Sequence, residues 1–284
     1  MIKRLFVLLQ YLLPQHRLSR LVGRLAQATQ PWLKNPMIKA FIRHYSVDMN
    51  EASEPDSDAY SCFNDFFTRA LKPGARPIDS SPSSLVCPAD GSVSQLGEIV
   101  EGRIFQAKGQ FYSCLELLGG DAALANSFAG GRFATIYLSP RDYHRVHMPC
   151  AGQLRTSIAV PGNLFSVNAV TTHQVPRLFA RNERLITIFD TDRGSMAMVL
   201  VGAMIVAGIE TVWGGQALPM SRRIQRLDYR PEARSINLAK GEEMGRFKLG
   251  STVILLFPNN SVTWDPAFSA DSRTRMGEVF GQLV

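Results

Sequence analysis

The sequence predicts an α+β protein, in which a core of mainly antiparallel β-sheet follows an N-terminal amphipathic helical region. From about residue 84 onward, short apolar and β-branched runs alternate with Gly, Pro, Asn and Asp turns, as is typical of antiparallel strands. Before residue 48, apolar side chains recur instead at helical spacing. The chain of 284 residues is 45% hydrophobic and 19% charged, so it can fill a core. Disordered, collagen-like and coiled-coil proteins are therefore excluded.

The first predicted elements are two short helices separated by Pro14. Residues 2–13 are almost entirely apolar, and in residues 18–25 leucine and valine recur at positions i, i+3, i+4 and i+7. Three arginines share this spacing on a different face of the second helix. An apolar stripe beside a basic face is the pattern of a helix that lies in a membrane interface. The first apolar run is far shorter than the roughly 20 residues that span a bilayer.

The positive charge of the chain is concentrated in residues 1–47. Eight Lys and Arg residues and no acidic residue precede Asp48, whereas the remaining residues carry 23 bases and 24 acids. A nucleic-acid-binding protein with a broad basic face would not show this distribution. We therefore expect residues 1–47 to be a membrane-association segment for an anionic lipid surface, and we expect no nucleic-acid partner. Two interpretations stay open: a signal peptide, which Gln10 and Tyr11 interrupt, and helices that only pack on their own domain.

The body of the protein, residues 48–284, is predicted to be one domain rich in strands. A polar and acidic stretch, residues 46–62, is expected to link it to the helical segment. The strand-like runs are FATIYL, RLITIF, MAMVLVGAMIVAGIETVW and TVILLF. The longest apolar run, Met196–Ile209, contains two glycines and is too short for a membrane span, so we expect a buried strand or a pair of strands. The four cysteines form no C-x-x-C pair, which favours reduced thiols in a cytosolic compartment over disulfides or a zinc ribbon.

Two short segments with turn-forming residues each carry one reactive group, a carboxylate in the first and a hydroxyl in the second. In Pro88–Gly91, Asp90 lies in a typical turn and matters chemically only where a basic group needs a carboxylate partner. In Leu249–Thr252, Gly250 and Ser251 precede a predicted strand. A glycine followed by a serine can form a strained peptide beside a hydroxyl nucleophile, but it is more often a bulge or a turn.

A third segment, Leu138–Pro149, holds two of the five histidines close together. Ser139 is a good N-cap and a proline follows it, so a short helix is predicted to begin there and to end near His144. His147 would then lie at the start of the next strand. The spacing H-R-V-H matches none of the zinc signatures, and we expect no metal site. Two satisfied core or surface histidines remain the simplest interpretation of this segment by itself.

Taken together, these segments resemble the phosphatidylserine decarboxylase family in its bacterial, membrane-associated form. The family hallmark L-G-S-T is matched by Leu249–Thr252, the D-G pair by Asp90 and Gly91, and the Y-H-R-x-H motif by Tyr143–His147. Supporting stretches are FNDFFTRALKPGARPID (63–79), LFSVN (164–168), NER (182–184) and VGAMIVAGIE (201–210). The match covers roughly residues 60–260, and the motif positions show no departure.

The resemblance implies a proenzyme that cuts itself between Gly250 and Ser251, giving a β chain, residues 1–250, and an α chain, residues 251–284. A hydroxyl is a weak nucleophile and needs an adjacent base, for which His147 is the matching residue. Asp90 would bind the other ring nitrogen of His147, as in serine–histidine–aspartate triads. Ser251 itself would become the covalent pyruvoyl cofactor.

The resemblance also implies the reaction and its location. The pyruvoyl group would form a Schiff base with the amine of phosphatidylserine, and loss of CO2 would give phosphatidylethanolamine. His144 would handle the substrate carboxylate or protonate the carbanion. The partners implied are phosphatidylserine in an anionic membrane and the two chains of one precursor; the oligomeric state, including a homodimer, stays open. The location implied is the cytoplasmic side of the inner cell membrane, with peripheral attachment.

Two other functions remain compatible with the residues alone. One is a conventional serine hydrolase that uses Ser251, His147 and Asp90 without self-cleavage, although the G-x-S-x-G elbow is missing. The other is a non-enzymatic peripheral membrane protein whose β-domain carries lipid. Whether the purified protein runs as one chain or two distinguishes both from the proenzyme.

Overall fold

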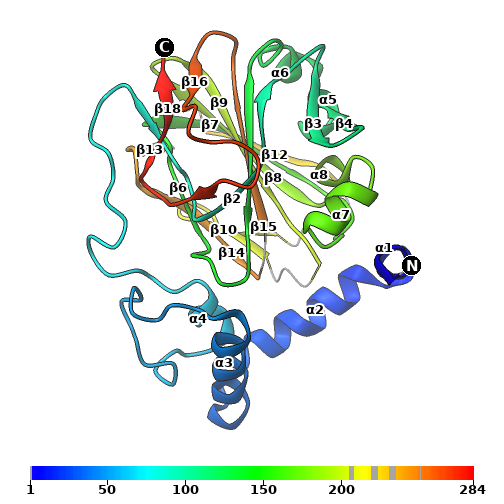
Figure 1. The fold of residues 1–284 in the computed structure, drawn as a ribbon, viewed down its shortest axis with the longest axis vertical. Coiled ribbons are helices and arrows are strands. Elements are labelled where there is room, and N and C mark those ends of the chain that lie inside the picture. The colour runs from blue at the N-terminus through cyan, green and yellow to red at the C-terminus, as the bar shows by residue number, and fades with distance from the viewer. Residues whose placement is uncertain (1, 205–207, 219–222, 230–234, 250) are drawn as a thin grey trace.

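The computed structural model describes residues 2–204, 208–218, 223–229, 235–249 and 251–284 (Figure 1). Within these residues the body is built around a nine-stranded sheet in the order β12-β7-β8-β9-β15-β5-β2-β17, with β13 paired to β7, and every pairing is antiparallel. Its strands are β2 (Gly91–Glu98), β5 (Arg132–Leu138), β7 (Gly152–Val160), β8 (Arg184–Thr191), β9 (Gly194–Val201), β12 (Gln225–Asp228), β13 (Asn237–Leu238), β15 (Ser251–Phe257) and β17 (Arg273–Thr274). The predicted α+β fold with a mainly antiparallel sheet is confirmed.

Smaller elements cover the two faces of this sheet. Three further sheets contain β6 (Arg145–His147), β10 (Gly208–Thr211), β11 (Gly215–Leu218) and β14 (Glu243–Lys248); β1 (Ser84–Val86), β16 (Val262–Trp264) and β18 (Val279–Leu283); and β3 (Arg103–Ala107) with β4 (Gln110–Ser113). The short helices of the body are α5 (Cys114–Leu117), α6 (Ala122–Asn126), α7 (Ala169–Gln174) and α8 (Leu178–Arg181). The helices α5–α8 and the β3–β4 hairpin lie on one face, and the other two sheets lie on the opposite face.

The strand β15 is central and buried on both faces, which explains its uninterrupted apolar sequence. Ile254 and Leu256 belong to the core on the helical side, whereas Val253, Leu255 and Phe257 belong to the core on the other side. This alternation is the two-residue period of an extended strand. A strand with both faces covered reads as a continuous apolar run. The apolar run that begins at Met196 likewise forms two strands, β9 and β10, as predicted.

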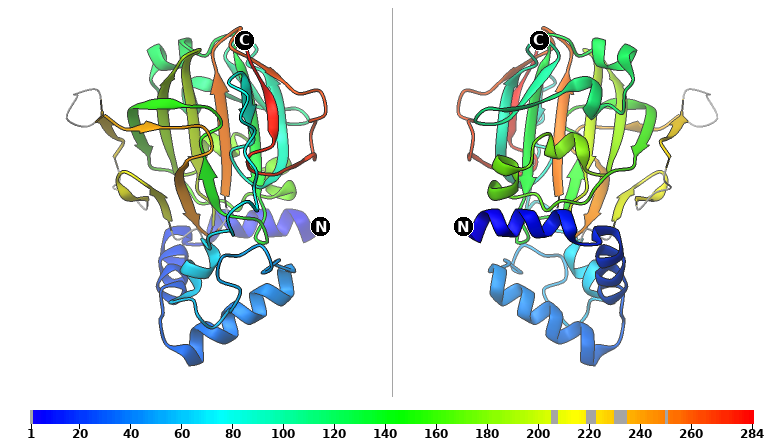
Figure 2. Two further views of the ribbon diagram at one scale, coloured as in Figure 1. Left: turned by 90° about the vertical axis from the view of Figure 1, so that its left-hand side faces the viewer. Right: turned by 90° about the vertical axis from the view of Figure 1, so that its right-hand side faces the viewer.

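The N-terminal segment folds into three helices that lie along one end of the body (Figure 2). They are α1 (Ile2–Leu12), α2 (Gln15–Ala26) and α3 (Pro31–Tyr45), so the two helices predicted on either side of Pro14 are present. The helix α3 packs against α4 (Phe63–Phe67) in a cluster that we call the α3–α4 cluster. It contains Ala26, Ile38, Val47, Tyr60, Phe63, Phe66 and Phe67. No helix among the described residues is long and apolar enough to cross a membrane.

The predicted linker, residues 46–62, contains no helix, and its only β contact is a single bridge from Ala52, yet it packs against the body. Ala52 and Tyr60 are buried, and Glu51 forms ion pairs with Arg76 and Arg275. The segment therefore holds the helical arm and the body together instead of separating them.

The short helix predicted to begin at Ser139 is wrong, because these residues form a turn between β5 and β6. The backbone N–H of Asp142 donates to the carbonyl of Ser139, and the Asp142 carboxylate accepts from both the N–H and the hydroxyl of Ser139. Arg273 pairs with the same carboxylate. These contacts satisfy the capping groups within one turn, and the chain then enters β6, whose last residue is His147.

Candidate active site

The predicted nucleophile lies at one end of the central strand. Ser251 is the first residue of β15, and its backbone pairs with Leu138, the last residue of β5. Gly250 lies outside the described residues. Leu249 has a φ of 74°, a left-handed conformation that costs a residue with a Cβ of order 1–3 kcal/mol. Its side chain packs on the α3–α4 cluster, so tertiary packing holds a strained residue close to the predicted cleavage site.

Hydrogen bonds connect His144 to the turn that follows β5 and to β14, the strand that precedes β15. Its Nε2 lies 3.1 Å from the carbonyl oxygen of Ser139, and its own carbonyl accepts from the backbone N–H of Phe247 at 3.0 Å. The ring is fully buried and stacks on Phe67, with ring centroids 4.0 Å apart. The fold therefore places His144 next to the residues that flank the predicted cleavage site.

The surroundings of His144 keep it neutral with one free nitrogen. Burial, and secondly the positive charge of Arg69, lower the pKa of His144 to about 3. A carbonyl oxygen only accepts, so Nε2 carries the proton and donates to Ser139. Nδ1 then carries a lone pair, and within the described part of the chain it has no hydrogen-bond partner. A buried acceptor without a partner costs about 1–3 kcal/mol, which marks this atom as a candidate contact for a ligand.

Arg69 is a second buried group with unused hydrogen-bonding capacity, and the sequence reasoning did not single it out. Its Nη2 donates to the carbonyl of Arg141 at 3.2 Å, whereas Nε and Nη1 have no partner among the residues described. The guanidinium lies over the ring of Phe66, and only 4% of the residue is exposed. Burial lowers the pKa of Arg69. Arg69 lies inside the stretch 63–79 that resembles the family, but a single sequence gave no reason to choose it there.

His147 is held by two partners that differ from the predicted one. Nδ1 lies 2.8 Å from the carbonyl oxygen of Gly241 and therefore donates, so Nε2 accepts from the hydroxyl of Tyr143 at 3.0 Å. Burial lowers the pKa of His147, opposed in part by the charges of Glu243 and Asp90. The ring is therefore neutral near pH 7, with Nε2 as its basic nitrogen.

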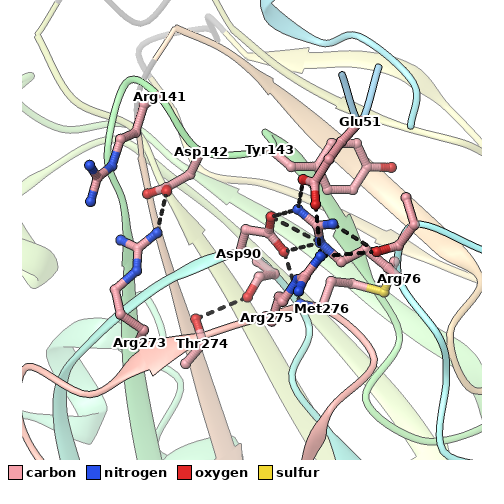
Figure 3. A network of polar contacts seen from close by, with 12 residues as sticks. Glu51, Arg76, Asp90, Arg141, Asp142, Tyr143, Arg273, Thr274, Arg275 and Met276 are labelled. Carbon is pink, nitrogen blue, oxygen red and sulfur yellow. Dashed lines mark hydrogen bonds and ion pairs between the residues drawn. The ribbon is translucent and has the colours of Figure 1, made fainter. Parts of the chain in front are cut away.

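Asp90 binds Arg76 (Figure 3), and not the ring of His147. Both carboxylate oxygens accept from Arg76, at 2.6–3.1 Å, and the backbone N–H of Met276 donates to Oδ1 at 2.9 Å. Glu51 binds the same guanidinium. The predicted Asp90–His147 hydrogen bond is thus not formed, because both ring nitrogens have nearer partners and a bidentate guanidinium is the stronger partner for a carboxylate. The backbones remain close, since the N–H of His147 donates to the carbonyl of Pro88 at 2.8 Å.

The sheet register relates Asp90 to Ser251. Ser92 of β2 and Thr252 of β15 pair with the same residue of β5, Tyr137, from its two sides. Asp90 and Ser251 therefore lie at the same end of the sheet, on either side of the end of β5. Neighbouring strands are about 4.8 Å apart, so β2 and β15 are separated by roughly 10 Å. Of the predicted site residues that the structure describes, Asp90, Ser251 and His144 thus lie at one sheet end, and the backbone of His147 lies beside that of Pro88.

Comparisons with known proteins agree on one family. A family model described as phosphatidylserine decarboxylase matches residues 63–282, and a second model, described as PSD, matches residues 5–46. The chain is 60% identical over 277 residues to a phosphatidylserine decarboxylase proenzyme of Pseudomonas entomophila, covering 97% of this chain and 96% of the relative. It is 58% identical over 280 residues to the protein of that name from Ectopseudomonas mendocina, covering 98% of each chain. A relative of the same name from Hahella chejuensis is 55% identical over 281 residues, covering 99% of this chain and 94% of the relative.

Proposed function

The chain belongs to the phosphatidylserine decarboxylase family, and we propose that Ser251, His147, Asp90 and His144 carry its chemistry. The protein is a phosphatidylserine decarboxylase that is made as a self-processing proenzyme. The observation that carries the assignment of residues is the register of β15 and β5. It sets Ser251 beside the turn that holds His144, at the sheet end where Asp90 also lies.

Self-processing begins with the hydroxyl of Ser251, which attacks the carbonyl carbon of Gly250 and converts the peptide bond to an ester. The proton of the hydroxyl goes to Nε2 of His147, which the Gly241 carbonyl keeps unprotonated by fixing the proton on Nδ1. Asp90 stabilises the imidazolium through space, since its charge raises the pKa of His147. Elimination then releases the chain 1–250 with a free carboxylate, and hydrolysis expels the former amino nitrogen of Ser251 as ammonia and leaves a pyruvoyl group at the start of the chain 251–284.

The polar atoms near Ser251 fit a pyruvoyl cofactor derived from that residue. Two nitrogens of Arg69 are buried without partners in the described chain, so a carbonyl or carboxylate at this place would complete their hydrogen bonds, whereas the unpartnered Nδ1 of His144 would accept from a donor. The pyruvoyl group supplies the electrophilic carbonyl that takes up the substrate amine and accepts the electron pair left when CO2 departs.

Arg69 and His144 divide the handling of the substrate. Nδ1 of His144 has no proton to donate to a carboxylate, whereas Arg69 has N–H groups free, so we assign the substrate carboxylate to Arg69. After burial, the charge of Arg69 is the next cause that lowers the pKa of His144, and a bound carboxylate neutralises that charge. His144 then becomes easier to protonate at Nδ1, from which it delivers a proton to the carbon that lost CO2.

Residues 1–47 hold the enzyme on the membrane that contains its substrate. Large apolar side chains of this segment are more than 40% exposed: Leu5, Phe6, Leu8, Leu9, Tyr11, Leu12, Leu13, Leu21, Leu25, Trp32. Exposed apolar groups next to basic side chains favour attachment to the surface of an anionic bilayer. We place this attachment on the cytoplasmic side of the inner membrane, where the anionic headgroups attract the bases.

Intact-mass spectrometry of the purified protein tests self-processing directly. The expected result is two chains, residues 1–250 and 251–284, with a carbonyl that reacts with hydrazine at the start of the shorter one. An active preparation with one intact mass of 284 residues and no reactive carbonyl would exclude the mechanism. Release of CO2 from phosphatidylserine labelled in its carboxyl group, measured on the same sample, tests the decarboxylation.

A further inference from the structure

The bend between α1 and α2 forms a pocket of about 380 Å³ against the body of the protein. Arg17, Arg20 and Arg181 line it together with Tyr11, and no Asp or Glu is among its lining residues. We propose that this pocket binds the phosphate of an anionic phospholipid headgroup, as a site separate from the end of β15 where the reaction takes place. The proposal rests on the membrane attachment argued above and adds a specific site to it.

The charges of the pocket are not compensated within the described protein. The side chains of Arg17 and Arg20 are exposed and form no ion pair or hydrogen bond with any described residue. Arg181 donates to the hydroxyl of Tyr11 at 3.2 Å, and its guanidinium lies 5.4 Å from that ring and 4.9 Å from the ring of Phe165. These contacts orient the guanidinium without neutralising it. Three positive charges around one cavity repel each other, and a bound anion removes that repulsion.

A buried acidic group, Glu183, contacts the histidine that lines the pocket. Glu183 lies 3.9 Å from Nδ1 of His16, and Nε2 of His16 contacts the carbonyl of Gly162 at 3.0 Å. The Glu183 side chain is only 6% exposed, so it is withdrawn beneath the pocket surface. It can balance at most one of the positive groups. The three arginines remain available for an oxyanion.

Two buried glutamines fix the walls of the pocket. The side-chain oxygen of Gln15 accepts from the backbone N–H of Leu164 at 2.6 Å, and that of Gln10 accepts from the N–H of Ser166 at 2.9 Å. The amide nitrogen of Gln15 also donates to the carbonyl of Gln10 at 2.7 Å. The bend of the arm is thereby attached to the loop before α7. A site that is already formed loses little conformational freedom when it binds a ligand.

The rim of the pocket favours a lipid over free phosphate. Leu13 and Tyr11 are exposed and line the pocket, and the adjacent Leu12 is 82% exposed. An inorganic ion gains nothing from these apolar groups, whereas a phospholipid can place its phosphate among the arginines and its acyl chains along the apolar surface of α1. Guanidinium groups are also suited to phosphate, which they bind with paired hydrogen bonds.

The test compares two double variants of the full-length protein that lose the same charge. Arg17→Gln with Arg20→Gln removes two arginines of the pocket, while Arg24→Gln with Arg43→Gln removes two exposed arginines of the same arm that do not line it. Binding is measured by sedimentation with phosphatidylcholine vesicles that contain or lack phosphatidylglycerol. We expect the pocket variant to lose at least about tenfold more affinity for phosphatidylglycerol vesicles than the matched control. Equal losses would mean that only the total charge of the arm matters, and would overturn the site.

Soluble probes separate the lipid from a simple anion. A short-chain, monomeric phosphatidylglycerol should displace the wild-type protein from vesicles far better than inorganic phosphate at equal concentration and ionic strength. Equal displacement by inorganic phosphate would overturn the assignment to a lipid. Both variants should still be processed into two chains, which reports on the fold. Because vesicle binding needs no decarboxylation, failure of this proposal and failure of the proposed reaction give different results.

Discussion

Arg76 binds both carboxylate oxygens of Asp90 through Nε and Nη2, and the two side chains are only 7% and 9% exposed. A buried guanidinium left without this partner is far more costly than a broken surface pair. Opposing burial, the hydrogen bonds that Arg76 donates to Asp90 and Glu51 raise the pKa of Arg76, so the group stays charged throughout the working range.

Replacing Asp90 by Asn should therefore destabilise the fold as well as slow processing. We expect the free energy of unfolding to fall by roughly 3 kcal/mol, at the low end for a buried pair because Glu51 remains bound to Arg76. Urea denaturation in a Ser251→Ala background, where the chain stays whole, measures this change. The control is Asp58→Asn, which breaks the exposed pair with Lys39 and should cost less than about 1 kcal/mol. Similar losses for the two variants would contradict a structural role of the Asp90–Arg76 pair.

Replacing Ser251 by Ala should leave the protein as one chain, because no hydroxyl remains to attack the Gly250 carbonyl. Ser251→Cys keeps a nucleophile at this position and should still cleave, though slowly. Intact mass after prolonged incubation distinguishes the two variants. Complete cleavage of Ser251→Ala would show that another nucleophile or a contaminating protease cuts the chain.

The two histidines should fail at different stages. His147→Ala removes the nitrogen that takes the proton from the hydroxyl of Ser251, so this variant should not be cleaved. His144→Ala should still cleave, at least partly, and should decarboxylate phosphatidylserine poorly. Cleavage is followed by gel electrophoresis, and decarboxylation by CO2 release per mole of processed chain. The reverse pattern, with unprocessed His144→Ala and normal maturation of His147→Ala, would exchange the two roles.

Replacing Arg69 by Met should weaken productive binding of phosphatidylserine without weakening binding of the product. A charge-assisted hydrogen bond contributes about 1.5–3 kcal/mol, so kcat/KM should fall roughly 10- to 100-fold, mainly through KM. Inhibition by phosphatidylethanolamine, which has lost the carboxylate, should be unchanged, and Arg69→Lys should restore part of the activity. An equal rise in the inhibition constant of phosphatidylethanolamine would assign Arg69 to the phosphate instead.

The buried neutral state of His144 should make the protein less stable in mild acid. Its pKa is about 3 when folded and near 6.5 when unfolded, so between these values the unfolded chain binds more protons. The neutral His144 contributes its full share of stability above pH 6.5. This share is lost as the pH falls, and the loss in the free energy of unfolding reaches about 2 kcal/mol at pH 5. His147, whose pKa is also lowered, adds a loss of the same sign.

The share of His144 is measured with a variant that cannot titrate. In the Ser251→Ala background, the free energy of unfolding is compared at pH 7.5 and pH 5 with and without His144→Gln. The variant should show a drop about 2 kcal/mol smaller than that of the parent. Identical drops would mean that folding does not lower the pKa of His144 and would remove the basis for its neutral Nδ1.

The sequence by itself determined the elements whose signals are local. Pro14 separated two helices because proline disrupts a helix interior, and the unbroken apolar run ending at Phe257 became a strand buried on both faces. The L-G-S-T, D-G and Y-H-R-x-H motifs were also legible, since each is contiguous. They were sufficient for the family, which the comparisons later supported over most of the chain.

Only the tertiary structure decided which groups face one another. Ser139 has the sequence of a helix N-cap but forms a turn, because the Asp142 carboxylate satisfies its N–H and hydroxyl and the chain must return into β6. Asp90 binds Arg76, fourteen residues before it, although the motif suggested His147 as its partner. Charged and polar side chains choose partners by distance and burial after the chain has folded, and the spacing of residues along the chain carries little information about that choice.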